Sequence, residues 1–386
     1  MADSAPPLPL CDRAAFLHGT QPKSPVVRFM CDELASKSMR ALTVEPRRPH
    51  SAQLEELPDQ PPEAGKVSLE MLAVGVCGTD AAIVAGHHGA PAPGRARLVL
   101  GHESIACVAA SAEGFEASEF VVPIVRRPDP VPCSSCAAGE WDMCRNGRYT
   151  EHGIKELDGF CAERVNVDPR YLVRIAPSLG LLGVLLEPTS VVAKAWEQIE
   201  RIGQRAHWAP RHVVVTGAGP IGLLAALIGR QKDLDVHVFD REQSGAKPTL
   251  AAALGAHYHA QGLRDLLNEI PADIVLECTG ANSVVLEVMS ANARGAITCL
   301  LGVSASGRRE PVDLGGLNRS IVLENDVVFG SVNANRRHYE AAARVLEQAD
   351  RAWLERLISR RVPLERWPEA LEHRAQDVKV VIELAR

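Results

Sequence analysis

The feature that most constrains the fold is a glycine motif placed between an apolar run and a helical run. Residues 212–216 read His-Val-Val-Val-Thr, typical of a short buried strand, and a Gly-x-Gly-x-x-Gly motif follows at once. In this order the glycines serve a tight turn, close approach of backbone to a pyrophosphate, and close packing of helix on strand. The motif therefore predicts a dinucleotide-binding unit with the phosphates at a helix N-terminus. The residues expected to bind them are Gly217, Gly219, Pro220, Ile221 and Gly222.

An acidic residue stands where the next predicted strand ends. Val236–Phe239 is an apolar run, and Asp240 follows it, eighteen positions after the last glycine of the motif. A carboxylate at this point can accept hydrogen bonds from both ribose hydroxyls of NAD and repels the 2′-phosphate of NADP. Arg241 favours NADP instead, because a guanidinium can hold that phosphate, while Glu242 beside it counteracts this effect. We therefore expect NAD to be favoured over NADP, with Asp240 and Arg241 near the ribose.

The pattern of apolar residues separates the chain into two kinds of domain. Downstream, segments with helical spacing alternate with apolar runs such as Ile274–Glu277 and Ile297–Leu301, which predicts a Rossmann-type, doubly wound parallel sheet. Upstream, runs such as Val67–Val76 and Leu98–Ala110 are broken by glycine and proline, which predicts a β-rich, barrel-like domain. The expected fold class is α/β. The expected divisions are a partly disordered extension at 1–38, a β-rich domain of 39–188 and 335–386, and a nucleotide-binding domain of 189–334.

Composition and charge narrow the class of function. The 386 residues are 46% hydrophobic and carry a formal charge of −6, with Lys and Arg dispersed among acidic residues. Such a chain lacks the basic footprint of a nucleic-acid-binding protein, so we expect no nucleic-acid partner. No stretch reaches the roughly 18 apolar residues that a membrane-spanning helix needs, and the first residues lack a secretory pattern. We therefore expect a cytoplasmic protein without a membrane partner.

Residue types that bind zinc stand at the ends of two apolar runs. Cys77-Gly-Thr79-Asp80 ends one apolar run, and Gly101-His102-Glu103 ends another. A thiolate, an imidazole and a carboxylate are ligands that zinc accepts in an open, catalytic coordination sphere. Taken singly, such a cysteine or histidine is more often a packed core residue. Their shared position at strand ends is what suggests a metal centre.

A second group of cysteines, Cys133-x2-Cys136-x7-Cys144, lies in a segment of turn formers. In a chain of this length without a secretion signal, clustered cysteines more often hold a metal than form disulfides. A closed tetrahedral zinc site needs four ligands, and this group supplies three. The spacing therefore points to a structural zinc that lacks one cysteine.

Several short motifs follow one another in a fixed order along the chain. Besides the glycine motif they are Cys-Gly-Thr-Asp at 77–80, Leu-Gly-His-Glu at 100–103, Arg-Arg-Pro at 126–128, Asp-Gly-Phe at 158–160, Leu-Glu-Pro at 186–188 and Gly-Ser-Val-Asn at 330–333. With these motifs, 39–386 resembles the zinc-dependent medium-chain dehydrogenases, and within them the glucose 1-dehydrogenase branch best known from archaea. The resemblance implies a GroES-like catalytic domain joined to a Rossmann domain, and NAD(P)-dependent oxidation of a CH–OH group.

The resemblance also assigns roles to individual residues. It implies that Cys77, His102 and Glu103 surround a catalytic zinc, with Glu187 binding the metal directly or through water. It implies that Thr79 contacts the reacting hydroxyl. The residues expected to contact the sugar are Glu151, Glu187 and Asn333, and those expected near the nicotinamide, at later strand ends, are Thr279, Gly302 and Asn333.

The chain departs from the family pattern at three places. Pro130 stands where the first of the four cysteines of the zinc lobe is usual, so the lobe either uses the nearby Asp129 carboxylate or holds no zinc. Val125 and Leu323 stand where polar sugar contacts are usual, so we expect weaker selection for glucose. Residues 81–83 lack the histidine that often relays the proton, so ribose, water or another residue must do so.

The predicted reaction is hydride transfer from a sugar or polyol carbinol, such as C1 of an aldose, to NAD(P), with a lactone as product. A dehydrogenase of a secondary-metabolic alcohol or aminocyclitol is one alternative, because Val125 and Leu323 are apolar. A catalytically inactive nucleotide-binding sensor or assembly protein is another, because the cysteine group is incomplete. A homodimer or homotetramer is the expected assembly.

Overall fold

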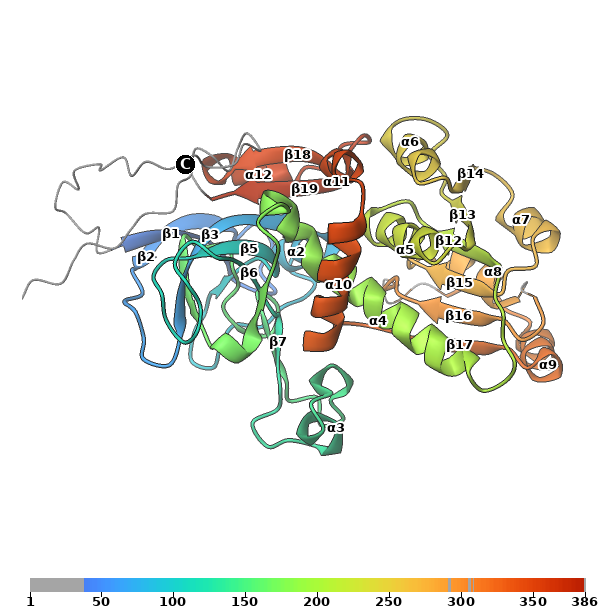
Figure 1. Cartoon of the computed structure of the whole chain (residues 1–386), viewed down its shortest axis with the longest axis horizontal. Coiled ribbons are helices and arrows are strands. Elements are labelled where there is room, and N and C mark those ends of the chain that lie inside the picture. The colour runs from blue at the N-terminus through green and yellow to red at the C-terminus, as the bar shows by residue number, and fades with distance from the viewer. Residues whose placement is uncertain (1–37, 291–292, 305–306, 308, 385–386) are drawn as a thin grey trace, which may run out of the picture. The chain divides into compact units, whose positions relative to one another are not determined.

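The computed structural model describes residues 38–290, 293–304, 307 and 309–384, and the chain divides into two compact units (Figure 1). The first unit contains the described residues up to Glu187 together with 360–373 and 380–384. The second unit contains Pro188–Ser359 and Arg374–Lys379. The extension predicted at 1–38 lies outside the described residues, except for Ser38. Within the described part of the chain, no helix has the length and apolarity needed to cross a membrane.

One domain boundary differs from the prediction. Helices α10 (Arg336–Gln348) and α11 (Arg351–Leu357) belong to the second unit, whereas the prediction placed all of 335–386 in the first. Trp353 of α11 is buried and donates a hydrogen bond from Nε1 to the carbonyl of Leu250, 103 positions earlier. The boundary therefore moves to about residue 360. A contact at this sequence separation leaves no trace in the local periodicity from which the prediction was made.

The first unit is β-rich, as the glycine- and proline-broken runs predict. Its largest sheet has the strand order β11-β6-β5-β3-β19-β18, with β10 also paired to β3, and two three-stranded sheets, β2-β1-β4 and β7-β8-β9, accompany it. The strands are β1 (Ser38–Val44), β2 (Gln53–Pro58), β3 (Val67–Val76), β4 (Leu98–Val99), β5 (Glu103–Val108), β6 (Phe120–Pro123), β7 (Arg126–Arg127), β8 (Thr150–His152), β9 (Glu156–Leu157), β10 (Arg164–Val167), β11 (Leu172–Arg174), β18 (Ile358–Pro363) and β19 (Lys379–Glu383). Its helices are the short α2 (Gly78–Val84), α3 (Ser134–Ala137) and α12 (Trp367–Leu371).

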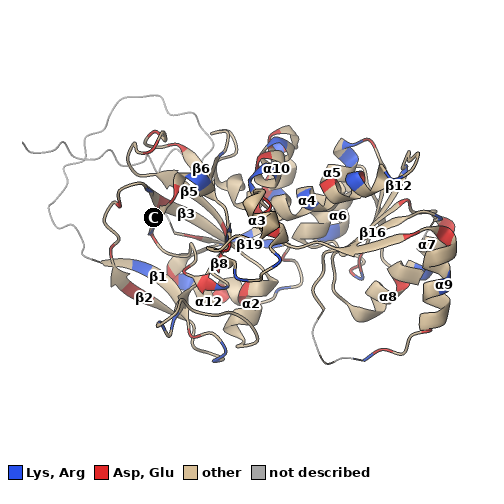
Figure 2. Ribbon diagram, turned by 90° about the horizontal axis from the view of Figure 1, so that it is seen from below, with Lys and Arg blue, Asp and Glu red and all other residues tan. Residues whose placement is uncertain are grey.

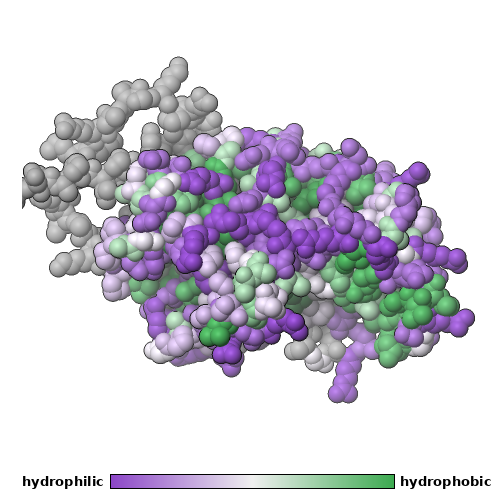
Figure 3. Space-filling view, turned by 60° about the horizontal axis from the view of Figure 1, so that its bottom comes forward, coloured by the Kyte–Doolittle hydropathy of each residue, from purple (hydrophilic) through white to green (hydrophobic). Residues whose placement is uncertain are grey.

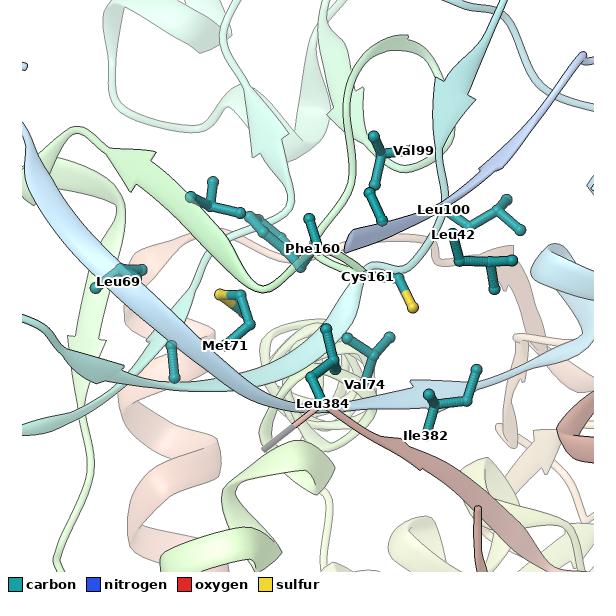
Figure 4. Close-up of a cluster of buried hydrophobic side chains, with 14 of the residues drawn as sticks. Leu42, Leu69, Met71, Val74, Val99, Leu100, Phe160, Cys161, Ile382 and Leu384 are labelled. Carbon is teal, nitrogen blue, oxygen red and sulfur yellow. The ribbon is translucent and has the colours of Figure 1, made fainter. Parts of the chain in front are cut away.

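Strand β3 runs through the middle of this unit and carries much of its core. It spans the predicted run, and its apolar side chains are buried between neighbouring strands. Figure 4 shows Leu69, Met71 and Val74 of β3 close to Phe160 and Cys161, which come from a distant loop. At about 25 cal/mol per Å² of apolar surface, each such side chain contributes roughly 2 kcal/mol when it leaves water.

Gly101 interrupts the predicted run Leu98–Ala110 and separates β4 from β5. Its φ of +90° is a left-handed value that favours glycine, and a Cβ there would clash with Val74. The carbonyls of Leu100 and Gly101 accept hydrogen bonds of 2.9 Å from the amides of Cys161 and Phe160. The loop of the Asp-Gly-Phe motif therefore holds the backbone that leads into His102.

The second unit contains a six-stranded parallel sheet in the order β14-β13-β12-β15-β16-β17, which confirms the predicted doubly wound architecture (Figure 1). Gly229 of α5 packs against Val236 on one face, whereas residues of α7 and α8 pack with Val214 and Val275 on the other. The strands are β12 (His212–Thr216), β13 (Asp235–Phe239), β14 (His257–His259), β15 (Ile274–Glu277), β16 (Ile297–Leu300) and β17 (Val327–Gly330). The helices are α4 (Leu186–Gly203), α5 (Pro220–Gln231), α6 (Ala246–Ala253), α7 (Leu263–Glu269), α8 (Asn282–Ser290), α9 (Leu314–Glu324), α10 and α11.

Charged residues of both signs are interspersed along both units (Figure 2). Many of them form ion pairs between segments that are distant in sequence. The guanidinium of Arg40 on β1 binds the carboxylate of Glu163, for example, and Arg164 on β10 pairs with Asp59. These pairs tie the edges of the first unit together.

Candidate metal centres and nucleotide-binding loop

Cys77, His102 and Glu103 form the first group of ligating side chains. Their ligand atoms all lie within 4.8 Å of one another, and Cys77 Sγ is 3.1 Å from His102 Nε2. Cys77 follows β3 directly and is the N-cap of α2, so its sulfur lies at the N-terminus of that helix and accepts a backbone N–H there. His102 and Glu103 are buried where β5 begins. The antiparallel pairing of β3 with β5 brings the two strand ends together.

Asp80 supports this group, and the sequence analysis did not assign it a role. Its Oδ2 accepts the backbone N–H of Cys77 at 3.0 Å, and its Oδ1 lies 3.4 Å from His102 Nδ1. A carboxylate behind an imidazole fixes the ring and leaves Nε2 to bind a metal. The Cys-x-x-Asp spacing, which is that of a capping box, is the sequence signal that could have indicated this role of Asp80.

The charges around His102 favour a cation. Burial alone would lower the pKa of His102, but Cys77 and Asp80 raise it well above the ordinary value. The imidazole thus faces two groups, a thiol and a carboxylate, that favour a positive charge at this place. Zinc accepts sulfur, nitrogen and oxygen ligands of this kind, so the donor set fits that ion.

Thr79 and Glu187 have different relations to this group. The backbone N–H of Thr79 donates to Cys77 Sγ at 3.2 Å, which places Thr79 directly beside the thiol. Glu187 is buried in the first turn of α4, but it is not a member of the three-residue group. The structure therefore brings together four of the five expected catalytic residues, namely Cys77, His102, Glu103 and Thr79.

Glu151 of β8 forms a buried ion pair. Its Oε1 accepts two hydrogen bonds from the guanidinium of Arg126 on β7, from Nε at 3.0 Å and from Nη2 at 2.9 Å. The same guanidinium lies 3.7 Å from the ring centroid of Tyr149. The Arg-Arg-Pro motif therefore supplies the partner that orients Glu151, which the sequence alone did not indicate.

The three cysteines of the second group also meet. The ligand atoms of Cys133, Cys136 and Cys144 lie within 4.8 Å of one another. Backbone N–H groups that include those of Arg145 and Cys136 donate to the sulfur of Cys133 and lower its pKa to about 6. Burial raises the pKa of Cys136 to about 11. Cys133, an N-cap of α3, is thus already favoured in the thiolate form that zinc binds.

Asp129, the expected substitute for a fourth cysteine, is used differently. Its Oδ1 accepts the backbone N–H of Val131 and its Oδ2 accepts the side-chain amide of Asn146, both at 2.8 Å. The carboxylate is not part of the three-thiol group. In this structure Asp129 therefore shapes the loop that carries the cysteines.

The glycine motif joins β12 to α5 as predicted. Gly217 has a φ of +89°, and its N–H donates to the carbonyl of Phe239 at 2.7 Å. A Cβ on Gly222 would lie far inside van der Waals contact with the Gly217 carbonyl, so helix and turn pack too closely for any side chain. A Cβ on Gly219 would meet nothing within 4 Å, which leaves its surroundings open. Pro220 and Ile221 form the first turn of α5.

Asp240 follows β13 and is tied to this motif. Its Oδ2 accepts the N–H of Ala218 at 2.7 Å, and its Oδ1 accepts the N–H of Glu242 at 3.1 Å. Lys247 lies between the two carboxylates, with Nζ 3.4 Å from Asp240 Oδ2 and 2.6 Å from Glu242 Oε1. Arg241 is exposed. Lys247 is a further cation near the expected ribose position that the sequence analysis did not consider.

Thr279 and Gly302 lie at the same edge of the sheet as the motif. A Cβ on Gly217 would lie 2.9 Å from Thr279 Cγ2, and the N–H of Gly302 donates to the carbonyl of Glu277 at 2.9 Å. The carboxylate of Glu277, which is fully buried, accepts the N–H groups of Thr279 and Gly280. No role was predicted for Glu277. The signal that could have indicated one is an acidic residue at the end of a predicted strand, two positions before Thr279.

Asn333 has a left-handed backbone and a local hydrogen bond. Its φ is +61°, its side chain is buried, and its Oδ1 accepts the N–H of Ala334 at 2.7 Å. It follows edge strand β17 in the second unit. The structure thus fixes its conformation, but its predicted contacts with sugar and nicotinamide stay predictions.

Comparisons with known proteins agree over most of the chain. The family described as Glucose dehydrogenase C-terminus matches residues 180–384, and the Alcohol dehydrogenase GroES-like domain matches residues 63–177. Glucose 1-dehydrogenases from Methanocella arvoryzae and Thermoproteus tenax are 36% and 39% identical, and in both cases 90% of this chain and 99% of the relative are covered.

Solved structures give the same result. The glucose dehydrogenase of Haloferax mediterranei, in complex with NADP, Zn and gluconolactone, has a TM-score of 0.84 and 30% identity. The comparison covers 90% of this chain and all of that one. Together, the two family matches, the curated relatives and the shared two-unit architecture show that this chain belongs to the glucose 1-dehydrogenase branch of the zinc-dependent medium-chain dehydrogenases, enzymes that oxidise CH–OH groups with NAD(P).

Proposed function

We propose that this chain oxidises the C1 carbinol of an aldose to a lactone with a nicotinamide cofactor and a catalytic zinc. The observation that carries the proposal is the convergence of Cys77, His102 and Glu103, with Asp80 behind His102. An inactive sensor would have little need for so complete a donor set. The relative from Haloferax mediterranei, which binds gluconolactone, supports a sugar as the substrate class.

The zinc would be held by Cys77 and His102, with Glu103 and Glu187 as nearby carboxylates. When bound, zinc acts as a Lewis acid that polarises a substrate oxygen. Asp80 keeps the His102 ring oriented, and the hydroxyl of Thr79 accepts the proton of the reacting carbinol and passes it on. Because 81–83 contain no histidine, that proton leaves Thr79 Oγ1 through water or ribose.

We infer that Glu151 and Asn333 contact sugar hydroxyls. Arg126 holds Glu151 in one orientation through two hydrogen bonds to a single oxygen, which preorganises the carboxylate. The left-handed backbone of Asn333 similarly fixes its side chain. Val125 is buried and Leu323 is exposed, and neither can replace the polar contact expected at its position. A secondary-metabolic alcohol or aminocyclitol therefore remains the alternative substrate.

The nicotinamide cofactor would bind in the open space around Gly219, at the N-terminus of α5. When bound, it would supply the acceptor for the hydride of the carbinol carbon. Thr279 and Gly302 lie at the same sheet edge as Gly217, where the nicotinamide half is expected. We propose NAD as the preferred form, because Asp240 and Glu242 place two carboxylates near the ribose. Arg241 and Lys247 oppose this preference, and the Haloferax mediterranei relative binds NADP.

The three-cysteine group is proposed to bind a second, structural zinc. Its fourth ligand would be water rather than Asp129, because both carboxylate oxygens of Asp129 already accept hydrogen bonds. A site of three thiolates and water satisfies the tetrahedral preference of zinc.

We also propose that the chain forms homodimers through its second unit. Strand β17 is the edge of the parallel sheet, and α9 beside it exposes Leu314, Val322 and Leu323. Figure 3 shows apolar side chains gathered at the end of the molecule that carries α9. Exposed apolar patches next to an unpaired strand edge are typical of self-association surfaces.

The proposed function is tested by metal analysis combined with a sugar panel. We expect one or two zinc ions per chain and turnover of at least one aldose, with the lactone identified as product. Activity on polyols or aminocyclitols without activity on any aldose would support the alternative substrate. A chain with less than one zinc and no oxidation of any alcohol would overturn the proposal.

The cofactor preference is tested by the substitution Asp240→Ala. Loss of the ribose-binding carboxylate should raise KM for NAD much more than KM for NADP, because only NAD has a free 2′-hydroxyl. Steady-state kinetics with both cofactors give the ratio, and Asp233→Asn, at an exposed position before β13, is the control. Equal effects on both cofactors would place the ribose elsewhere.

A further inference from the structure

Four histidines and one aspartate gather on one face of the parallel sheet in the second unit. His212, Asp235 and His257 are the first residues of β12, β13 and β14, which lie side by side (Figure 1). His237 and His259 stand two positions further along β13 and β14. The register pairs His212 with Asp235 and His237 with His257. Because side chains alternate along a strand, all five project from the same face.

The aspartate is at the centre of this histidine cluster. Asp235 Oδ2 lies 3.3 Å from His212 Nδ1 and 3.4 Å from His237 Nε2, and Asp235 Oδ1 lies 3.4 Å from His257 Nε2. The ligand atoms of His212, Asp235 and His237 are all within 4.8 Å of one another. Two imidazole nitrogens and one carboxylate oxygen thus converge on one point.

The converging nitrogens are not satisfied by hydrogen bonds. His212 Nδ1 and His237 Nε2 are both buried atoms without a hydrogen-bond partner, and His237 as a residue is only 7% exposed. The other nitrogen of His237, Nδ1, lies 3.0 Å from His259 Nε2. In the tautomer in which Nδ1 donates to His259, the lone pair of Nε2 faces the carboxylate of Asp235, 3.4 Å away. Two electron-rich groups at this separation are stabilised by a cation between them.

We propose that His212, Asp235 and His237 form a binding site for one divalent transition-metal ion, with His257 as a fourth ligand. Imidazole-rich sites select zinc, cobalt, nickel or copper over calcium and magnesium, which prefer oxygen ligands. Asp235 and His257 are 42% and 62% exposed, so an ion can enter from solvent. The site lies at the opposite strand ends from the glycine motif, about 15 Å away along β12 at about 3.3 Å per residue. The proposed role of the ion is therefore to hold strands β12, β13 and β14 together rather than to take part in catalysis.

The test is a cobalt titration of the full-length zinc enzyme, followed by metal analysis and visible absorption. We expect one additional cobalt per chain. Its spectrum should lack the thiolate-to-cobalt charge-transfer band, which a cobalt ion bound at either cysteine-containing group would show. We also expect cobalt to raise Tm, because an ion that binds only the folded state stabilises it.

Two exposed positions provide the test variants. Asp235→Asn and His257→Gln should each weaken cobalt binding at least tenfold and abolish the rise in Tm, while sugar oxidation and the circular dichroism spectrum stay at wild-type values. His207→Gln, at an exposed histidine of the same unit outside the cluster, should bind cobalt like the wild type. The proposal is overturned if no additional cobalt binds, if the added cobalt shows the thiolate band, or if Asp235→Asn binds as tightly as the wild type.

Discussion

At the scale of single residues, Asp80 shows how one side chain can serve both folding and chemistry. Its Oδ2 caps α2 by accepting the N–H of Cys77, and its Oδ1 stands behind the imidazole of His102. The same carboxylate thus positions the thiol through the backbone and the imidazole through its ring. Burial makes both contacts strong, because water does not compete for the oxygens.

The substitution Asp80→Asn separates these two contacts. The amide oxygen can still cap α2, but the negative charge behind His102 is lost. We expect zinc affinity to fall about 10- to 100-fold, as is usual when a carboxylate partner of a histidine ligand is removed. Competition with a chelator measures the affinity, and Asp59→Asn, which affects only the pair with Arg164, is the control. Wild-type zinc affinity in Asp80→Asn would refute the supporting role.

At the scale of elements, the turn from β12 to α5 is built by glycines with different tasks. A Cβ on Gly222 would clash with the carbonyl of Gly217, whereas a Cβ on Gly219 would meet nothing within 4 Å among the residues that the structure describes. Gly222 therefore serves the packing of helix on strand, and the space around Gly219 is available for a ligand. The strand-turn-helix sequence could be predicted, but this division of tasks depends on the packed geometry.

The pair of substitutions Gly222→Ala and Gly219→Ala tests this division. We expect Gly222→Ala to lower the free energy of unfolding by about 2–3 kcal/mol, because overpacking forces the turn away from α5. Gly219→Ala should leave stability within about 0.5 kcal/mol of the wild type, but raise KM for the cofactor at least tenfold. Urea unfolding and steady-state kinetics measure both. The reverse order of stabilities would contradict the structure of the turn.

At the scale of the whole molecule, ion pairs join segments of the first unit that are far apart in sequence. Arg40 on β1 binds Glu163 through its backbone N–H and its guanidinium, and it also pairs with Glu365 near the C-terminus. Burial alone would raise the pKa of Glu163, but the hydrogen bonds and charge of Arg40 lower it below the ordinary value of 4.5. The stability of this unit is therefore linked to pH.

The direction of that link follows from the lowered pKa. The contribution of Glu163 is fully present above pH 4.5 and is lost as the pH falls below this value, because the unfolded chain binds the proton more readily. Glu163→Gln should lower the free energy of unfolding by about 1–2 kcal/mol at neutral pH and flatten its decline in acid. Denaturant unfolding between pH 3 and 7 measures this, with Glu63→Gln at an exposed pair as the control. An unchanged acid limb would show that Glu163 does not carry the linkage.

The second unit shows which parts of the fold were visible in the sequence. The runs at 213–216, 236–239 and 274–277 are local patterns, and all three form strands of the parallel sheet. The residues that form helix α10 were assigned to the first domain, but they belong to the second unit. Periodicity reports which face of an element is buried, and it does not report which partner covers that face.

By itself, the sequence determined the α/β class, the nucleotide-binding motif and the residue types of the metal centres, because strand, turn and helix preferences act over a few neighbouring residues. Only the tertiary structure decided that Cys77 meets His102, 25 positions away, with Asp80 behind it, and that Asp129 stays out of the cysteine group. The histidine cluster around Asp235 was equally hidden. Strand register sets such encounters, and register is chosen by the packing of the whole core rather than by the residues that meet.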